Sequence, residues 1–321
     1  MQIVLILVVY LFVIPAFAAS QEPRQLQFTY ELLPQDFPSD EAVDIYIPLP
    51  AQNDGQRVRV ESLQSFVPAT LGEDNVHGNT FLHLRRPANS NTPLTATLSW
   101  TIDRDVAEAS GASELAAAER EQYLAPNALV PVDHEILQPI LAEIHQRRVD
   151  DSPAATARAI YDWVVDNVEY KKVGTGWGNG DTFWACNERY GNCTDFHALF
   201  ISLARSEGIP ARFEIGFPIP QDREAGEIGG YHCWVQFYLP ERGWVPIDAS
   251  EAAKNPELRD KLYGGQPADR ILFTTGRDLI VSEVSGKAPL NYFIYPYVEV
   301  GGKPWKGTMP TRFSFVELSS S

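Results

Sequence analysis

The sequence predicts an α+β protein in which a small antiparallel β domain, sandwich-like in its pattern, precedes a mixed domain of helices and strands. Residues 24–104 alternate apolar and polar side chains with a period of two, and no helical period competes. From residue 131 onward, helical and strand patterns follow one another, and turn residues separate them. The chain has 321 residues, which is enough for two modest domains.

An apolar run from Ile3 to Phe17 opens the chain, and Ala16-Phe17-Ala18 fits a small-x-small cleavage site. Residues 1–18 are therefore predicted to be a signal peptide, which implies a secreted or periplasmic protein. Met1-Gln2 carries no side-chain cation, so an uncleaved anchor is the alternative, and only that alternative would associate the protein with a membrane. The run is short for a spanning helix.

Residues 19–105 are predicted to form the β domain. The clearest strand places Leu94, Ala96, Leu98 and Trp100 on one face, with threonine and serine between them. Residues 106–130, rich in alanine, glutamate and serine, are interpreted as a partly helical linker.

Two helices are predicted after the linker. One spans residues 137–144 and starts or kinks at Pro139. The other spans 153–168, with Ser152 as its cap and Pro153 in its first turn. We expect this second helix to pack beside a third, which begins at Cys193.

Gly191 and Asn192 are turn and cap residues, and apolar side chains then recur at helical spacing from Phe196 to Leu203. Cys193 therefore lies in a first helical turn, where free N–H groups and the helix dipole lower a thiol pKa. The alternative is a buried structural cysteine.

Two strand patterns, residues 231–238 and 243–250, flank a turn at 240–243 and predict a hairpin. His232 and Asp248 would approach each other across it. A symmetric four-residue turn leaves them about three residues out of step, which a bulge, a shorter loop or side-chain reach must correct. A thiol, a histidine and a carboxylate are the parts of a nucleophile, an acid/base and an orienting group.

At three segments the chain resembles the transglutaminase-like superfamily, in its secreted bacterial branch. The segments are Gly191-Asn192-Cys193-Thr194-Asp195-Phe196, His232-Cys233-Trp234 and Trp244-Val245-Pro246-Ile247-Asp248-Ala249-Ser250. The resemblance implies a papain-like catalytic domain at residues 131–290. The aromatic-rich residues 291–300 are predicted to be a further strand, so that residues 291–321 form a C-terminal strand and tail. It also implies a Cys193-His232-Asp248 triad and acyl transfer through a thioester. An amine acceptor would give transamidation, and water would give peptide or amide hydrolysis, which we favour as the default.

Other residues near these segments carry alternatives. Trp177 and Trp184 are candidates to line the cleft or donate to an oxyanion, although plain packing explains them equally well. His197 lies four residues after Cys193 and is a rival base or a metal-ligand partner of the thiol. The Asp195 carboxylate is expected to interact electrostatically with the start of the helix.

Three cysteines are present, so an oxidising compartment leaves at least one thiol unpaired. A Cys186–Cys233 disulfide beside a free Cys193 and three free thiols both remain possible. Cys233 neighbours His232 in a strand, so we expect it to point to the opposite face as a small buried hydrophobe.

The net charge of −16 disfavours nucleic acid and anionic membranes as partners. The resemblance implies that the substrate is a protein or peptide amide. No cofactor or metal is required by this chemistry, and no clear acidic calcium loop is present. A binding or scaffold module on the same fold, without catalysis, is the alternative function.

Overall fold

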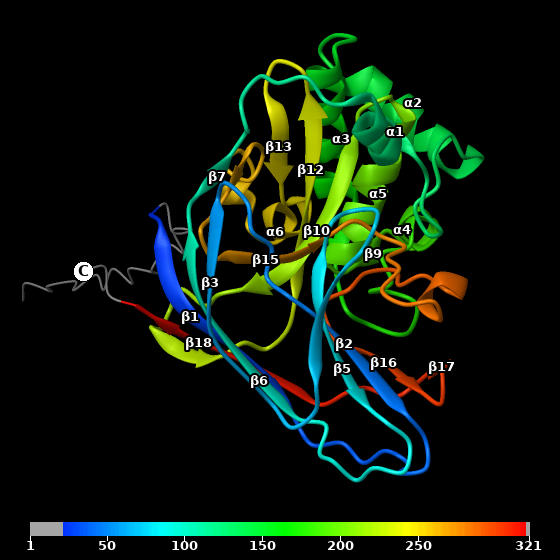
Figure 1. Cartoon of the computed structure of the whole chain (residues 1–321). Coiled ribbons are helices and arrows are strands. Elements are labelled where there is room, and N and C mark those ends of the chain that lie inside the picture. Colours follow the sequence, from blue (N-terminus) through cyan, green and yellow to red (C-terminus); the bar gives the residue numbers. More distant parts are fainter. Residues whose placement is uncertain (1–21, 319–321) are drawn as a thin grey trace, which may run out of the picture.

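The computed structural model describes residues 22–318, so the predicted signal peptide at 1–18 lies outside the described residues. Figure 1 shows two parts, a sandwich of long strands and a layer of helices beside a smaller sheet. This arrangement confirms the predicted α+β class.

Two five-stranded antiparallel sheets form the sandwich. In spatial order, the first contains β11 (Ala225–Glu227), β18 (Thr311–Glu317), β1 (Arg24–Leu32), β6 (Ala96–Arg104) and β3 (Gln56–Ser65). The second contains β17 (Lys303–Pro304), β16 (Tyr297–Val300), β2 (Val43–Pro48), β5 (Thr80–Arg86) and β4 (Ala69–Glu73). Strands from the end of the chain therefore pair with strands from its beginning.

The predicted period of two places the expected side chains in the sandwich core. Leu26, Phe28 and Tyr30 of β1 are fully buried there. In β2, however, Asp44 and Tyr46 on the opposite face are buried as well. Leu279, Val281 and Phe293 pack in one cluster with Tyr46, and His83 and Arg85 of β5 donate to Asp44. Strict alternation therefore does not give an exposed side.

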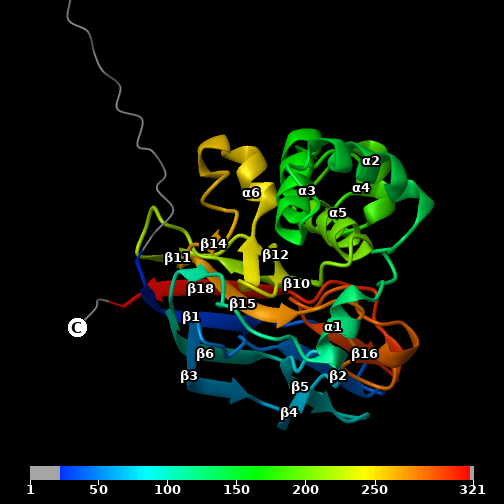
Figure 2. The ribbon, with the colours of Figure 1, turned by 90° about the horizontal axis from the view of Figure 1, so that it is seen from above.

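A four-stranded antiparallel sheet forms the centre of the second part. Its order is β13 (Gly243–Ile247), β12 (His232–Leu239), β10 (Ala211–Pro218) and β15 (Arg270–Thr275). Helices lie on one side of this sheet and the sandwich on the other (Figure 2). Phe217 and Phe273 each lie 5.4 Å, between ring centroids, from Phe28 of β1, so one core joins the two parts.

Four helices build the helical layer: α2 (Gln138–Arg147), α3 (Pro153–Asn167), α4 (Thr182–Glu188) and α5 (Cys193–Ser206). The backbone N–H of Ala155 donates to the Ser152 hydroxyl at 3.2 Å, which is the predicted cap of α3. Helix α3 contacts α5, as expected, and α5 lies on β12 and β10. The helix that carries Cys193 is thus held on both sides by buried elements.

Short elements complete the described chain. Within the predicted linker, β7 (Ala107–Glu108) pairs with β14 (Gly265–Gln266), and α1 (Ala117–Leu124) contacts α5 and β10. The others are β8 (Glu169–Tyr170), β9 (Tyr190–Gly191), α6 (Ala249–Lys254) and 3₁₀ turns at 135–137, 256–258 and 285–287. Strands β8 and β9 run parallel, and β9 leads directly into α5.

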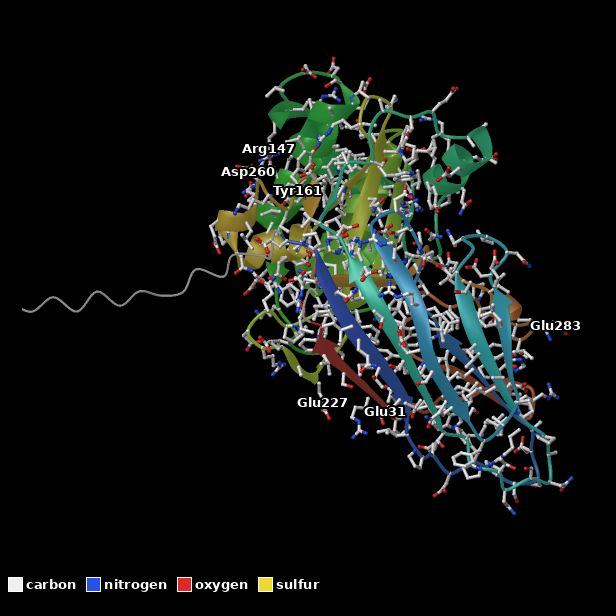
Figure 3. All side chains as sticks on the ribbon, turned by 60° about the vertical axis from the view of Figure 1, so that its left-hand side comes forward. Glu31, Arg147, Tyr161, Glu227, Asp260 and Glu283 are labelled. Carbon is white, nitrogen blue, oxygen red and sulfur yellow. The ribbon has the colours of Figure 1, made fainter. Side chains whose placement is uncertain are left out.

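Acidic side chains come to the surface from both parts of the molecule. Figure 3 labels Glu31 of β1, Glu227 of β11, Asp260 beyond α6 and Glu283 at its periphery. Within residues 22–318, no helix is long and apolar enough to cross a membrane.

Candidate active site

Cys193 is the first residue of α5, and side chains on both sides of it fix the helix start. The Asn192 Oδ1 accepts hydrogen bonds from the Thr194 backbone N–H at 2.9 Å and from its hydroxyl at 2.6 Å. The Asp195 carboxylate accepts one from the Asn192 N–H at 3.0 Å, which completes a capping box. The Cys193 side chain and its own N–H therefore lie at the positive end of the helix dipole.

The same carboxylate holds the glycine-rich loop that precedes the helix. Asp195 also accepts hydrogen bonds from the backbone N–H groups of Gly178 at 2.7 Å and Gly180 at 3.0 Å. A Cβ at residue 191 would overlap this carboxylate, which explains the glycine there. Asp195 thus organises the helix terminus and fixes the loop against it.

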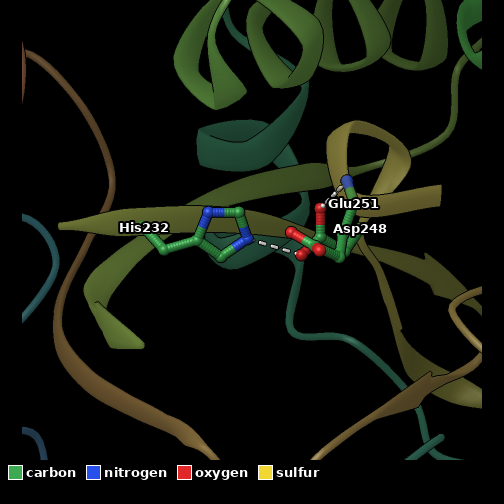
Figure 4. Close-up of side chains that lie close together, drawn as sticks. All are labelled: His232, Asp248 and Glu251. Carbon is green, nitrogen blue, oxygen red and sulfur yellow. Dashed lines mark hydrogen bonds and ion pairs between the residues drawn. The ribbon is translucent and has the colours of Figure 1, made fainter. Parts of the chain in front are cut away.

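The predicted hairpin is confirmed, and its register shows how His232 meets Asp248. Leu239 pairs with Gly243, so His232 would lie opposite Ser250 rather than Asp248. Asp248 closes this gap because it lies beyond the end of β13, where the chain turns into α6. The His232 Nε2–H donates to Asp248 Oδ2 at 2.5 Å (Figure 4).

Three further groups hold the Asp248 carboxylate. Its Oδ1 accepts hydrogen bonds from the Ser250 hydroxyl and from the Glu251 backbone N–H, both at 2.9 Å. Arg270 Nη2 lies 3.7 Å from Oδ2. Burial opposes ionisation, but the charges of His232, His197 and Arg270 and the His232 hydrogen bond hold the Asp248 pKa well below its ordinary value.

The Cys193 thiol lies close enough to the His232 imidazole for each to shift the pKa of the other. Because Nε2 is engaged with Asp248, Nδ1 is the ring nitrogen that remains for the sulfur. Burial raises the pKa of Cys193, but hydrogen bonds from Cys233 and His232, with the His232 charge, outweigh it and hold that pKa well below 9.0. Burial likewise opposes the charge on His232, yet Asp248 raises the His232 pKa to about 9. The pair therefore favours thiolate and imidazolium.

Trp177 and Trp184 lie near the loop but direct their indole N–H groups elsewhere. The Trp177 Nε1–H donates to the Gly174 carbonyl at 3.1 Å, and the Trp184 Nε1–H donates to the Tyr190 carbonyl at 2.8 Å. Either group would have to leave its carbonyl to reach an oxyanion. The backbone N–H groups at the start of α5 need no such change.

A second thiol and a second imidazole lie behind the first pair. Cys233 is fully buried, with its Sγ 3.4 Å from His197 Nδ1, and it lies close enough to Cys193 for the two thiols to shift each other's pKa. His197 Nε2 lies 3.6 Å from Asp248 Oδ1. The expected burial of Cys233 is confirmed, but its thiol also contacts His197 of α5, so it is more than a packing side chain. All three cysteines are free thiols.

A cleft of about 640 Å³ adjoins His232. Its walls combine tyrosine, lysine and arginine side chains with proline, isoleucine and leucine, and include Tyr170, Tyr231, Lys254 and Arg270. Tyr231 also closes over the start of α5, because its hydroxyl accepts a hydrogen bond from the Asn192 side-chain N–H at 3.1 Å. Only 2% of Cys193 is exposed, so the thiol lies behind the wall of this cleft.

His232, Asp248 and Glu251 offer ligand atoms that lie within 4.8 Å of one another (Figure 4). The first two are already hydrogen-bonded together. The Glu251 carboxylate pairs with Lys254 Nζ at 2.6 Å and accepts from the Asn255 side-chain N–H at 2.7 Å. Other side chains thus already pair with the atoms that would bind a metal ion, and we assign no metal to this group.

Sequence reasoning did not find Arg270 or the contacts of Cys233. Arg270 reaches Asp248 because β15 pairs with β10, and no local pattern reveals that pairing. The Cys233 contact had a weak signal, since a His-Cys dipeptide at a strand start can present both side chains to a helix terminus.

Comparisons with known proteins agree with this geometry. Residues 142–249, which include Cys193, His232 and Asp248, match the family model of the transglutaminase-like superfamily. An uncharacterized protein of Haemophilus influenzae is 26% identical over 346 residues, covering 95% of this chain and 93% of that protein. A protein-glutamine gamma-glutamyltransferase of Pseudomonas aeruginosa is 26% identical over 147 residues, covering 43% of this chain and 19% of that enzyme.

Among solved structures, a proposed cysteine protease from Cytophaga hutchinsonii aligns with a TM-score of 0.59 over 93% of this chain and 92% of that one. Their sequence identity is 18%, so this likeness concerns the fold. The family match and the α+β architecture agree, and residues 142–249 are the part of the chain that matches the transglutaminase-like superfamily.

Proposed function

We propose that the protein catalyses thiol-dependent acyl transfer from amide bonds, with Cys193 as nucleophile, His232 as acid/base and Asp248 as the group that orients His232. The observation that carries the proposal is the position of the Cys193 thiol, at a helix start and near the His232 ring, which is itself hydrogen-bonded to Asp248. A nucleophile, a base and a third group that orients the base are the parts this chemistry needs.

The steps follow from the charges of these groups. The Cys193 thiolate attacks the amide carbonyl, and the carbonyl oxygen becomes an oxyanion that backbone N–H groups at the start of α5 stabilise. The His232 imidazolium gives its proton to the departing nitrogen, and a thioester to Cys193 remains. His232 then takes a proton from the incoming acceptor, which attacks the thioester and frees the thiol.

We favour water as the acceptor, which makes the reaction peptide or amide hydrolysis, with transfer to an amine second. The polar and charged groups of the cleft beside His232 keep it accessible to water, and water reacts unless a site excludes it. The expected substrate is a protein or peptide amide. Because a signal peptide is predicted, we expect the reaction to take place outside the cell or in the periplasm.

The test uses a mixture of glutamine-containing peptides incubated with the purified protein, with and without a primary amine. Mass spectrometry distinguishes cleaved or deamidated products from amine adducts. Wild type should generate products that Cys193→Ala does not, and Cys186→Ala, which changes a buried thiol on α4, should behave as wild type. Equal products from wild type and Cys193→Ala would refute the proposal.

A non-catalytic binding module on the same fold is the second candidate. The burial of Cys193 favours it, because a substrate reaches the thiol only if groups such as Tyr231 move aside. Iodoacetamide labelling separates the two. A catalytic Cys193 should react at pH 6, where an ordinary thiol is almost wholly protonated, whereas a scaffold cysteine should not.

A further inference from the structure

Cys233 has no part in the acyl-transfer steps, yet it is fully buried against the nucleophile. We propose that Cys233 is a resolving thiol: when a peroxide oxidises Cys193, Cys233 captures it as a reversible Cys193–Cys233 disulfide. The disulfide itself does not depend on the proposed acyl transfer; only the accompanying loss of turnover does.

The positions of the two residues support this bond. Cys193 opens α5, Cys233 is the second residue of β12, and these elements pack against each other. The Cys233 thiol is directed at α5, since its Sγ lies 3.4 Å from Nδ1 of His197, about one turn along that helix from Cys193. A disulfide needs the two sulfur atoms about 2.05 Å apart. Side-chain rotation and a small shift at the helix start would bring them together.

The chemistry balances with a peroxide as the oxidant. The Cys193 thiolate attacks one oxygen of hydrogen peroxide, the O–O bond breaks, and with one proton the products are a sulfenic acid and water. The Cys233 thiol then attacks the sulfenyl sulfur, the S–O bond breaks, and the S–S bond forms. The Cys233 proton leaves with the hydroxide as a second water. Two thiols are oxidised and one peroxide is reduced.

His197 is placed to assist the second step. Its Nδ1 lies 3.4 Å from Cys233 Sγ, and Asp248 Oδ1 on its other side favours the proton at Nε2. Nδ1 can then accept the Cys233 proton. Burial lowers the His197 pKa to about 4, so the ring is neutral near neutral pH. Burial also raises the Cys233 pKa, so the Cys233 proton leaves as the S–S bond forms.

The third cysteine provides a matched control. Cys186 is also buried, but it lies on α4, where burial raises its pKa to about 11 and its charged neighbours are Arg189 and Asp181. Its thiol is therefore a poor target for peroxide.

The experiment treats the full chain with hydrogen peroxide, blocks free thiols under denaturing conditions, and maps disulfides by mass spectrometry of an unreduced digest. A parallel sample receives dithiothreitol first, and the alkylatable fraction of Cys193 is then measured. Wild type and Cys186→Ala should give the peptide pair linked through Cys193 and Cys233, and dithiothreitol should restore Cys193. In Cys233→Ala, Cys193 should advance to irreversible acids, with about tenfold less of it restored.

A linked pair involving Cys186, no linked pair in wild type, or full restoration of Cys193 in Cys233→Ala would each overturn the proposal. If Cys233→Ala does not fold, the wild-type map decides alone. None of these measurements uses an amide substrate, so failure of the acyl-transfer proposal and failure of the disulfide proposal are separate outcomes.

Discussion

Replacing Asp248 with asparagine changes the charge behind His232 but almost no volume. The amide oxygen can still cap α6 in place of Oδ1, which now accepts from Ser250 and Glu251. Its N–H₂ group, however, would donate to His232 Nε2, which must then be unprotonated. The proton of the neutral ring moves to Nδ1, the nitrogen that faces Cys193. The base would hold a proton where it needs to accept one.

The magnitude follows from the pKa of His232. Asp248 is the main cause of its rise from 6.5 to about 9, against burial. Since each pKa unit is worth about 1.4 kcal/mol, that rise corresponds to roughly 3 kcal/mol in favour of the imidazolium. Without the carboxylate, only the interaction with Cys193 still opposes burial and the charge of Arg270, so the His232 pKa should fall. Loss of the correct tautomer should reduce turnover roughly a thousandfold or more.

The assay is the pH dependence of Cys193 alkylation, measured beside turnover. In wild type the thiolate should persist down to low pH, and in Asp248→Asn the rate at pH 6 should fall at least about tenfold. Asp269→Asn is the matched control, because Asp269 accepts a hydrogen bond from Arg270 at 2.6 Å but, among the described residues, makes no hydrogen bond or ion pair with His232. An unchanged alkylation profile in Asp248→Asn would refute the reasoning.

Three further predictions concern stability. First, Gly216→Ala should lower the free energy of unfolding, measured with a chemical denaturant, by about 1–3 kcal/mol or more, because the new Cβ would overlap the Ile271 carbonyl oxygen. Gly229→Ala is the control, since a Cβ there meets open space and should change the stability little. Equal losses in the two variants would contradict this account. Second, Ser152→Ala removes the cap of α3 and should cost about 1 kcal/mol, and no loss of stability would mean that the cap is not formed in solution. Third, the stability of the fold should depend on pH through two groups. The raised pKa of His232 contributes stability that is full below pH 6.5 and is lost as the pH rises through about 9. The lowered pKa of Cys193 contributes stability that is full above pH 9.0 and is lost as the pH falls. Between pH 6.5 and 9 the two contributions offset each other, so the thermal stability of wild type should be nearly constant there. The stability of Cys193→Ala should fall across the same interval as the pH rises. Parallel curves of stability against pH for the two proteins would show that the groups are not coupled.

The local signals in the sequence were sufficient for the helix start and the hairpin. Gly191, Asn192 and the apolar spacing after Cys193 act through nearest neighbours, so they predicted both the cap and the buried face of α5. The hairpin pattern brought His232 and Asp248 together for the same reason. Its register needed the structure, because the reach of Asp248 depends on where β13 ends and α6 begins.

Contacts between distant segments were not predictable from such signals. The pairing of β18 with β1 joins the two ends of the described chain, and no local pattern encodes it. Residues 291–300 were predicted as one strand, but only Tyr297–Val300 is a strand, because Tyr292 packs beside Tyr231 near the site instead. Cys233 was placed by strand alternation alone, which ignores that a strand end can present two successive side chains to one helix terminus.

The measurement that tests the central claim most directly is turnover by Cys193→Ala, His232→Ala and the double variant on a verified amide substrate. Thermal unfolding of each variant is the control for folding. If the two residues form one catalytic unit, each single change should reduce turnover by several orders of magnitude, roughly the same amount, and the double change should add little. Wild-type turnover in Cys193→Ala, or losses that simply multiply in the double variant, would contradict the account.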